Sequence, residues 1–549
     1  MSGGKPPFPT CLNRSLNHFI KLKQFPNHVA KFVPNCLLAI FVLALAHSSA
    51  HAKTIEVKNM SELEAAIKAA QPGDNIQMAS GEWRDAVINF NASANEKLST
   101  TLRAKVPGQV TLTGKSKLRL NAPYLVVDGL LFRAGASSEG EPVIDFRSHH
   151  CRVTNTAIIK FNPADSNVRY HWVFFTGSEN RLDHTLLEGK NNRNPVVANG
   201  CCESRRNKVD FCYFKDIAFV PENGREIIQV QGVGRSDQYT QDGAFFTIEH
   251  NLFERADGEG AEIISIKSNF NLIRYNTIRA SRGGITLRSG YANTVDSNYI
   301  FGHGKTGTSG IRVQGPRQRV VNNYIEGVVH ALMLHTGEEL FTNGCITDYL
   351  TVDFVPLKRP EAPCGYVVRY GQVRDGLFAH NTFVNNSGID IYVGTNYKSG
   401  WPQQQMVRIP EANVFVNNLI YKPSGGPAIT TQIADTKPPF NKLNFKPNQF
   451  LFNLVFGGEL AIAESAVSLR FITKDPLLTN VDGMFRPSPR SPAKDAGPAI
   501  PSLFPGVFED IEGQRRSRPD IGADEISNDR LERRPLTPAD VGPVWMRTK

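Results

Sequence analysis

The sequence predicts an all-β fold of the solenoid type, a parallel β-helix, from three observations. Short β-rich segments recur along the chain, each with an asparagine or aspartate directly before a hydrophobic step. From Asn251 the asparagines follow one another at intervals of 25, 22 and 25 residues, and periods of about 20 to 50 residues are typical of solenoids. The two ends depart from this repeat, as expected for capping segments.

Stacked coils explain the repeated asparagines. In a parallel β-helix equivalent positions of successive coils lie about 4.8 Å apart, as in any β-sheet, so turn asparagines can form a hydrogen-bonded ladder. A leucine-rich repeat needs a leucine consensus that is absent, and a propeller needs about 40 or more residues per blade. The repeated segments are Val209–Phe211, His250–Phe253, Tyr275–Ile278, Ser297–Ile300, Asn322–Ile325, Asn381–Phe383 and Asn418–Ile420.

Residues 1–52 are interpreted as a secretory leader. Lysines precede the ten-residue apolar stretch Leu37–Ala46, and Ala50–Ala52 is a small-x-small cleavage site. A membrane helix needs about 20 apolar residues, so no membrane span is expected, and a buried helix is the alternative. Cleavage near Ala52 would give a periplasmic or secreted chain. The leader holds five basic and no acidic residues, so its removal lowers the net charge from +10 to +5.

The ends of the mature chain are predicted to cap the solenoid. An amphipathic helix from Ser61 to about Ala70 has Ser61 as N-cap and Glu64 at the capping-box position. It would cover an open sheet edge at the N-terminal end of the solenoid. We expect the β-helix domain at residues 53–525 and a wrapping C-terminal extension at 526–549; a separate small C-terminal domain is the alternative.

Six cysteines remain after the leader, and none has the spacing of a zinc site. An exported chain permits disulfides. A bridge from Cys345 to Cys364 that closes a loop is one interpretation, and the spacing leaves the other pairings open.

Basic side chains of successive repeats predict a groove that binds a polyanion. Arg288 follows Lys267 after 21 residues and Arg312 follows after a further 24, so the three would stack on one face beside Glu262. Cations stacked about 5 Å apart repel by about 1 to 3 kcal/mol at intermediate dielectric, which favours a compensating anion or a function. Solvated surface cations are the alternative.

The segments around these residues carry a family resemblance. They are Asn180–His184, Glu188–Lys190, Asn223–Glu226, Asp257–Ser268, Gly284–Gly290, Ser309–Gly315, Asn322–Gly327, Ser491–Gly497 and Asp520–Glu525. Over nearly all of the mature chain, the sequence resembles the chondroitinase B-like alginate lyases, polysaccharide lyase family six. The resemblance implies a single-stranded right-handed parallel β-helix that cleaves alginate, an anionic polysaccharide, by β-elimination to unsaturated oligosaccharides.

The resemblance also implies roles for individual residues. Lys267 would be the base that removes the C5 proton, and neighbouring cations would lower the pKa of its amine toward useful basicity. Arg288 would neutralise the carboxylate or assist protonation of the leaving oxygen. Arg312, Ser289 and His303 are expected in the substrate groove. Ser289 replaces the usual family histidine, which leaves substrate preference open; for His303, as for His335, a structural role is the alternative.

A calcium site is the remaining implication, because family members often hold Ca²⁺ at the substrate carboxylate. The implied ligands are Glu262, Glu259 and Asn223. The farther acid normally stands two residues before the nearer one, where this chain has Gly260, so Glu259 would reach the ion through a bulge. The alternative is that Glu262 merely pairs with a nearby arginine.

Other functions remain open. A dermatan sulfate or chondroitin lyase would share the fold and the chemistry. A glycosidase needs two carboxylates about 5 to 9.5 Å apart. The central coils carry lysine and arginine at the expected catalytic positions, which disfavours a glycosidase. Gly260 and Ser289 depart from the family pattern, so a non-catalytic polysaccharide-binding protein is a further alternative. No nucleic-acid partner is expected.

Overall fold

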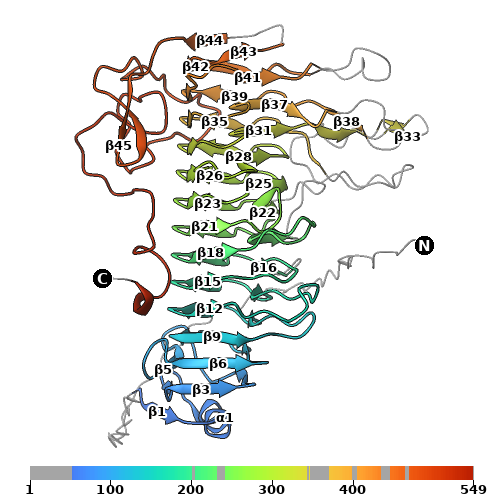
Figure 1. Ribbon diagram of the computed structural model, residues 1–549, viewed down its shortest axis with the longest axis vertical. Helices are drawn as coiled ribbons and strands as arrows, with labels where there is room; N and C mark the ends of the chain where they lie inside the picture. Colours follow the sequence, from blue (N-terminus) through green and yellow to red (C-terminus); the bar gives the residue numbers. More distant parts are fainter. Residues whose placement is uncertain are drawn as a thin grey trace, which may run out of the picture. The chain divides into compact units, whose positions relative to one another are not determined.

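The computed structural model describes residues 52–200, 204–231, 242–339, 341–342, 345–346, 370–397, 405–433, 445–463 and 469–547. The unit Ala52–Lys549 is compact by itself, and its strands stack as the coils of a parallel β-helix (Figure 1). The predicted fold class is therefore confirmed. No helix in the described ranges is long and apolar enough to cross a membrane.

Two parallel sheets form the walls of the coils. A typical coil gives two short strands to the larger sheet and then one to the smaller sheet. In the described ranges the smaller sheet has 13 strands, in this order: β4 (Val87–Phe90), β7 (Lys117–Leu120), β10 (Ile144–Phe146), β13 (Val173–Phe175), β16 (Val197–Asn199), β19 (Ile228–Gln231), β22 (Glu262–Lys267), β25 (Gly283–Ser289), β28 (Thr308–Val313), β31 (Leu332–His335), β37 (Ile391–Thr395), β41 (Pro427–Thr431) and β43 (Glu459–Ala461).

The larger sheet holds the paired short strands of each coil. Its members are β1 (Thr54–Val57), β2 (Asn75–Met78), β3 (Gly81–Arg84), β5 (Thr100–Ala104), β6 (Val110–Gly114), β8 (Leu125–Asp128), β9 (Leu130–Gly135), β11 (Arg152–Thr154), β12 (Ala157–Ile159), β14 (Arg181–Asp183), β15 (Leu186–Glu188), β17 (Lys208–Asp210), β18 (Tyr213–Ile217), β20 (Thr247–Glu249), β21 (Leu252–Ala256), β23 (Leu272–Arg274), β24 (Thr277–Arg279), β26 (Thr294–Asp296), β27 (Tyr299–Phe301), β29 (Arg319–Val321), β30 (Tyr324–Glu326), β35 (Leu377–Ala379), β36 (Thr382–Val384), β39 (Val414–Val416), β40 (Leu419–Tyr421), β42 (Gln449–Phe456) and β44 (Leu469–Ile472).

Three antiparallel pairs complete the strands. They are β32 (Gly337–Glu339) with β38 (Gln405–Arg408), β33 (Phe341–Thr342) with β34 (Cys345–Ile346), and β45 (Leu478–Val481) with β46 (Met484–Pro487).

Aliphatic side chains fill the interior of the coils. Successive residues of a strand point to opposite faces, so every second side chain enters the core. In the smaller sheet Ile264, Ile285, Ile311 and Leu332 stand in register on four successive strands and are fully buried. The intervening residues therefore face outward, which leaves one face of this sheet for chemistry.

An asparagine ladder fixes the register of the coils. Each side-chain Nδ2 donates to the Oδ1 of the next asparagine over 2.8 to 3.0 Å. The residue before each rung turns the chain in the left-handed region, as Tyr275 does with φ 57°. The predicted ladder is confirmed; its rungs are Asn251, Asn276, Asn298, Asn323, Asn381, Asn418 and Asn453.

The N-terminal helix α1 (Met60–Ala69) begins earlier than predicted. Its N-cap is Asn59, whose Oδ1 accepts a hydrogen bond from the Glu62 amide over 2.9 Å, while Glu62 accepts one from the Lys58 amide over 2.8 Å. The assignment of Ser61 and Glu64 to the capping box was therefore wrong. Asparagine is at least as good an N-cap as serine, and Asn59 precedes a turn that ends in a glutamate.

The C-terminal residues run back along the coils in Figure 1. The carbonyl of Pro498 accepts from Asn417, the amide of Leu536 donates to Thr277, and the Trp545 indole donates to the carbonyl of Asn155. Leu536 and Val541 also pack against outward apolar residues of the larger sheet. A 3-10 helix, η2 (Val544–Met546), lies near the end of this segment.

The cysteine pairing stays a prediction. Cys151 and Cys212 are buried free thiols. The proposed bridge from Cys345 to Cys364 lies outside the residues whose side chains the structure describes.

We predict that Asn298→Ala destabilises the fold. The Asn298 amide group donates to Asn323 and accepts from both the backbone and the side chain of Asn276. Its loss would leave buried polar groups unpaired and lower the free energy of unfolding by about 3 kcal/mol. Guanidinium denaturation followed by tryptophan fluorescence measures this change.

Asn89→Ala is the matched control, because Asn89 is exposed on β4. It should change stability by less than about 0.5 kcal/mol. Equal effects of the two substitutions would contradict a stabilising ladder.

Candidate active site

Three adjacent strands of the smaller sheet carry the predicted basic residues. Lys267 ends β22, Arg288 lies near the end of β25, and Arg312 lies on β28. Their neighbours Ile266, Leu287 and the isoleucine before Arg312 point into the core. Strand alternation therefore places all three cations on the outward face.

The cations share a face but not a column, which differs from the predicted stack. Lys267 pairs in register with Ser289, whereas Arg312 pairs with Thr286. The register shifts between Ile266 and Lys267, so Arg288 is the extra residue of a bulge. Bulges redirect side chains, and here Arg288 is out of register with Lys267.

Carboxylates lie between these cations. Lys267 Nζ is 2.8 Å from Glu226 Oε1. Glu262 Oε1 forms an ion pair with Arg312 and lies 3.7 Å from Arg288 Nε. Glu262 thus pairs with arginine, as the alternative interpretation proposed. These ion pairs reduce the electrostatic repulsion expected among the three cations.

The acidic cluster consists of Glu226, Glu259 and Glu262. Each offers an oxygen within 4.8 Å of the other two, and all three side chains are buried. Ile228 pairs with Ile264 in register, so Glu226 and Glu262, each two residues earlier, occupy equivalent places on successive coils. Such a set of hard oxygen donors suits a divalent cation such as Ca²⁺.

Glu259 joins the cluster despite Gly260. Its Oε2 accepts hydrogen bonds from the amides of Gly224, over 2.7 Å, and Arg225, over 3.4 Å. Burial, and then the charges of Glu226 and Glu262, raise the pKa of Glu259 to about 7. Proton uptake by Glu259 therefore limits the negative charge of the cluster near neutral pH.

Asn223 stays a predicted ligand. It is exposed in the turn before β19, and Glu226, three residues later, is the third acidic side chain of the cluster. Glu226 belongs to the segment Asn223–Glu226, which carries part of the family resemblance. Its position one coil before Glu262 was the signal that sequence reasoning missed.

Two buried cations support the turn that carries Glu226. Lys190 Nζ donates to the carbonyls of Asn192, Arg193 and Asn194 over 2.7 to 3.1 Å. Arg225 in turn donates to the carbonyls of Lys190 and Asn191. Burial, followed by the charge of Arg225, lowers the pKa of Lys190 well below its ordinary value. These contacts tie the turns of two coils together beside the acidic cluster.

Sequence reasoning also missed Tyr370. Arg288 Nη2 donates to its hydroxyl over 2.5 Å, and the guanidinium carbon lies 4.1 Å from the centre of its ring. Tyr370 stands 82 residues after Arg288 and belongs to no repeat, so only the folded chain brings the two together.

The two histidines occupy different places. His335 is buried, with Nδ1 3.1 Å from Gln314 Nε2. Burial, then the charges of Arg312 and Arg288, lower the pKa of His335 to about 3, so its ring is neutral beside the arginines. His303 is exposed, and its described contacts are with Arg279 and Phe301 of the larger sheet.

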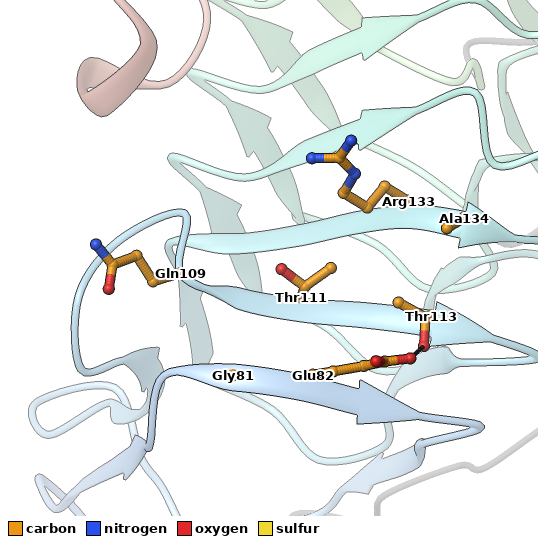
Figure 2. Close-up of a pocket in the computed structure, with 7 residues that line it drawn as sticks. All are labelled: Gly81, Glu82, Gln109, Thr111, Thr113, Arg133 and Ala134. Atoms are coloured by element: carbon orange, nitrogen blue, oxygen red, sulfur yellow. Dashed lines mark hydrogen bonds between the residues drawn. The ribbon is translucent and has the colours of Figure 1, made fainter.

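A pocket lies elsewhere on the molecule. Figure 2 shows it over β3, β6 and β9 of the larger sheet. Its lining shares no residue with the acidic cluster or its cations; it consists of Gly81, Glu82, Gln109, Thr111, Thr113, Arg133 and Ala134.

Comparisons with known proteins agree with this arrangement. The sequence profile described as chondroitinase B matches residues 57–344. The PL6 family polysaccharide lyase Pedsa3628 from Pseudopedobacter saltans is 43% identical, with a TM-score of 0.69, over 76% of this chain and 97% of that chain. The PL6 family alginate lyase AlyGC is 30% identical, with a TM-score of 0.65, over 83% of this chain and 60% of that chain. A comparison with curated proteins gave no match.

A parallel β-helix with these relatives is a polysaccharide lyase. The chain belongs to the chondroitinase B family, polysaccharide lyase family six.

We predict that Glu259→Gln stabilises the metal-free protein at pH 8 but not at pH 5. The raised pKa means that Glu259 is neutral in the folded protein at pH 5, whereas above about pH 7 its charge opposes those of Glu226 and Glu262. The folding stability of the parent therefore falls as the pH rises from the pKa of Glu259 in the unfolded chain through its pKa in the folded protein. With solvent screening, we expect a gain of about 1 to 2 kcal/mol for the variant at pH 8.

Thermal unfolding in EDTA at the two pH values checks this expectation. Glu96→Gln, at an exposed glutamate, is the control and should behave like the parent. A Glu259→Gln gain that is the same at both pH values would contradict the raised pKa.

Proposed function

We propose that this lyase cleaves alginate by β-elimination. The observation that carries the proposal is the outward face on which Lys267, Arg288 and Arg312 surround buried carboxylates. AlyGC, an alginate lyase, is 30% identical over 83% of this chain, which supports alginate as the substrate. The family description keeps dermatan sulfate and chondroitin as the competing substrates.

In the proposed reaction Lys267 is the base. Its neutral amine accepts the C5 proton of a uronate, and the electrons of that bond form the C4=C5 double bond as the C4–O bond breaks. Negative charge grows on the carboxylate during proton removal, and fixed positive charge stabilises a transition state most where charge develops. Arg288 and Arg312 supply this charge, and Arg312 also binds the neighbouring uronate.

We propose that Glu226, Glu259 and Glu262 hold a Ca²⁺ ion. Three carboxylate oxygens within 4.8 Å match the preference of calcium for hard oxygen ligands. Glu226 Oε2 is buried and has no hydrogen-bond partner among the described residues, so it is available as a ligand. When bound, the ion would add positive charge beside the substrate carboxylate.

We infer that the protein acts in the periplasm or after secretion. This inference rests on the leader predicted at residues 1–52, nearly all of which lies outside the described residues.

We predict that the parent releases products absorbing near 235 nm from alginate and that Lys267→Ala does so about 10³-fold more slowly, because a positioned base contributes about 10² to 10⁴ in rate. Lys97→Ala, at an exposed lysine, is the control and should match the parent. Product from dermatan sulfate alone would favour the competing lyase. A parent with no product on any uronate polymer would indicate a polysaccharide-binding protein.

We predict that Glu226→Gln weakens calcium binding at least about tenfold, since ligand charge sets calcium affinity. Asn223→Ala should leave the affinity nearly unchanged, because Asn223 is exposed in its turn. Isothermal titration of EDTA-treated protein with CaCl₂ measures both. Loss of calcium binding in Asn223→Ala, with normal binding in Glu226→Gln, would favour Asn223 over Glu226 as the ligand.

A further inference from the structure

The outward column of the smaller sheet continues past Arg312. Arg312 pairs in register with Met333 of β31, which pairs in turn with Tyr392 of β37. Ile391 and Val393 on either side of the tyrosine are buried, whereas Met333 and Tyr392 are partly exposed. Strand alternation therefore places both on the outward face that carries Arg312. Adjacent strands lie about 4.8 Å apart, so the backbone of Tyr392 stands about 10 Å beyond that of Arg312 along the stack.

The chemistry of this column changes after Arg312. The next three outward residues are Met333, Tyr392 and Thr430, and none of them carries a charge. A tyrosine ring combines an apolar face with a polar hydroxyl, and methionine is an adaptable apolar neighbour. A pyranose ring likewise has an apolar C–H face and a rim of hydroxyl groups. This part of the column therefore fits the sugar ring of a polymer, whereas Arg312 fits an acid group.

His330 adds a hydrogen-bond donor of fixed tautomer beside Tyr392. The centres of the two rings are 6.3 Å apart. The amide of Ile389 donates to His330 Nδ1 over 3.0 Å, so the proton of the neutral ring is on Nε2. Burial lowers the pKa of His330, which keeps the ring neutral at pH 7. A Cβ at Gly388 would lie 2.7 Å from this ring, so the glycine lets the imidazole pack against the backbone.

The spacing of these residues suits a polymer that follows the stack. A (1→4)-linked pyranose residue advances its chain by a length close to one sheet spacing, so successive sugars can meet successive coils. A uronate whose carboxylate binds Arg312 would then have its neighbour over Met333 and the following sugar over Tyr392.

We propose that Tyr392, with His330 beside it, forms a distal subsite that stacks on the pyranose ring of a uronate two residues beyond the one bound by Arg312. This assignment rests on the proposed function and concerns a sugar remote from the bond that breaks. Binding energy that is the same in the ground state and the transition state lowers KM without raising kcat. The subsite therefore favours chains long enough to reach from Lys267 to Tyr392, which stand four sheet spacings apart.

Saturated alginate oligomers of two lengths test this subsite. A hexamer can reach both Lys267 and Tyr392, whereas a trimer covers about three sheet spacings and cannot. Tyr392→Ala should lower kcat/KM on the hexamer about tenfold, through KM, and on the trimer by less than about threefold. Tyr392→Phe keeps the ring and should stay within about threefold of the parent on both. Initial rates of absorbance near 235 nm measure these constants.

Tyr124→Ala is the matched control. Tyr124 is also partly exposed but lies near the N-terminal end of the stack, beside His149 and His150, so this variant should match the parent on both oligomers. Circular dichroism and the thermal midpoint check the fold of each variant. An equal loss on hexamer and trimer in Tyr392→Ala, or an equal loss in Tyr392→Phe, would overturn the subsite.

A binding measurement separates the subsite from the proposed function. Isothermal titration with the alginate hexamer compares Lys267→Ala with the double variant Lys267→Ala/Tyr392→Ala, and the second should bind about tenfold more weakly. A parent that yields no unsaturated product, with this difference in binding intact, overturns the elimination and keeps the subsite. A parent that cleaves alginate, with equal affinities of the two variants, overturns the subsite alone. Absence of both cleavage and binding overturns both.

Discussion

In-register stacking of the coils is the constraint on which the site depends. Each coil is short and would be unstable alone, but the sheet hydrogen bonds and the asparagine ladder hold equivalent positions in line. This alignment brings Glu226, Lys267 and Arg312 together although each comes from a different coil. The chemistry is therefore set by register: a slip of one residue would turn the cations into the core and the isoleucines outward.

The electrostatics of the site are nearly self-contained. Lys267 pairs with Glu226, Arg288 and Arg312 lie against Glu262, and Lys190 and Arg225 are buried. Burial of an unpaired charge is costly, so the hydrogen bonds from Lys190 to backbone carbonyls replace the water that its ammonium has lost. The charged groups of the site are thus held by contacts within the protein itself.

Sequence reasoning predicted the features that repeat. The spacing of Asn276 and Asn298 predicted the solenoid, and the matched motifs placed Lys267 and Arg288 on one outward face. Features that arise from irregular turns were missed, because periodicity carries no information about them. Glu226 joins the acidic cluster from a turn before β19, and Tyr370 contacts Arg288 from a segment outside the repeat. The start of α1 differed because a capping box can be satisfied by more than one nearby pair.

The C-terminal segment gives the molecule an order of assembly. Synthesis proceeds from the N-terminus, so the coils near Asn155 exist before the residues that cover them, such as Trp545. The segment contacts the coil of Asn417, which follows β39, and the coil of Asn155, which follows β11. A solenoid otherwise loses coils one at a time from its ends. Contacts of this segment with both coils oppose the opening of either coil, which favours resistance to proteolysis once the segment has docked.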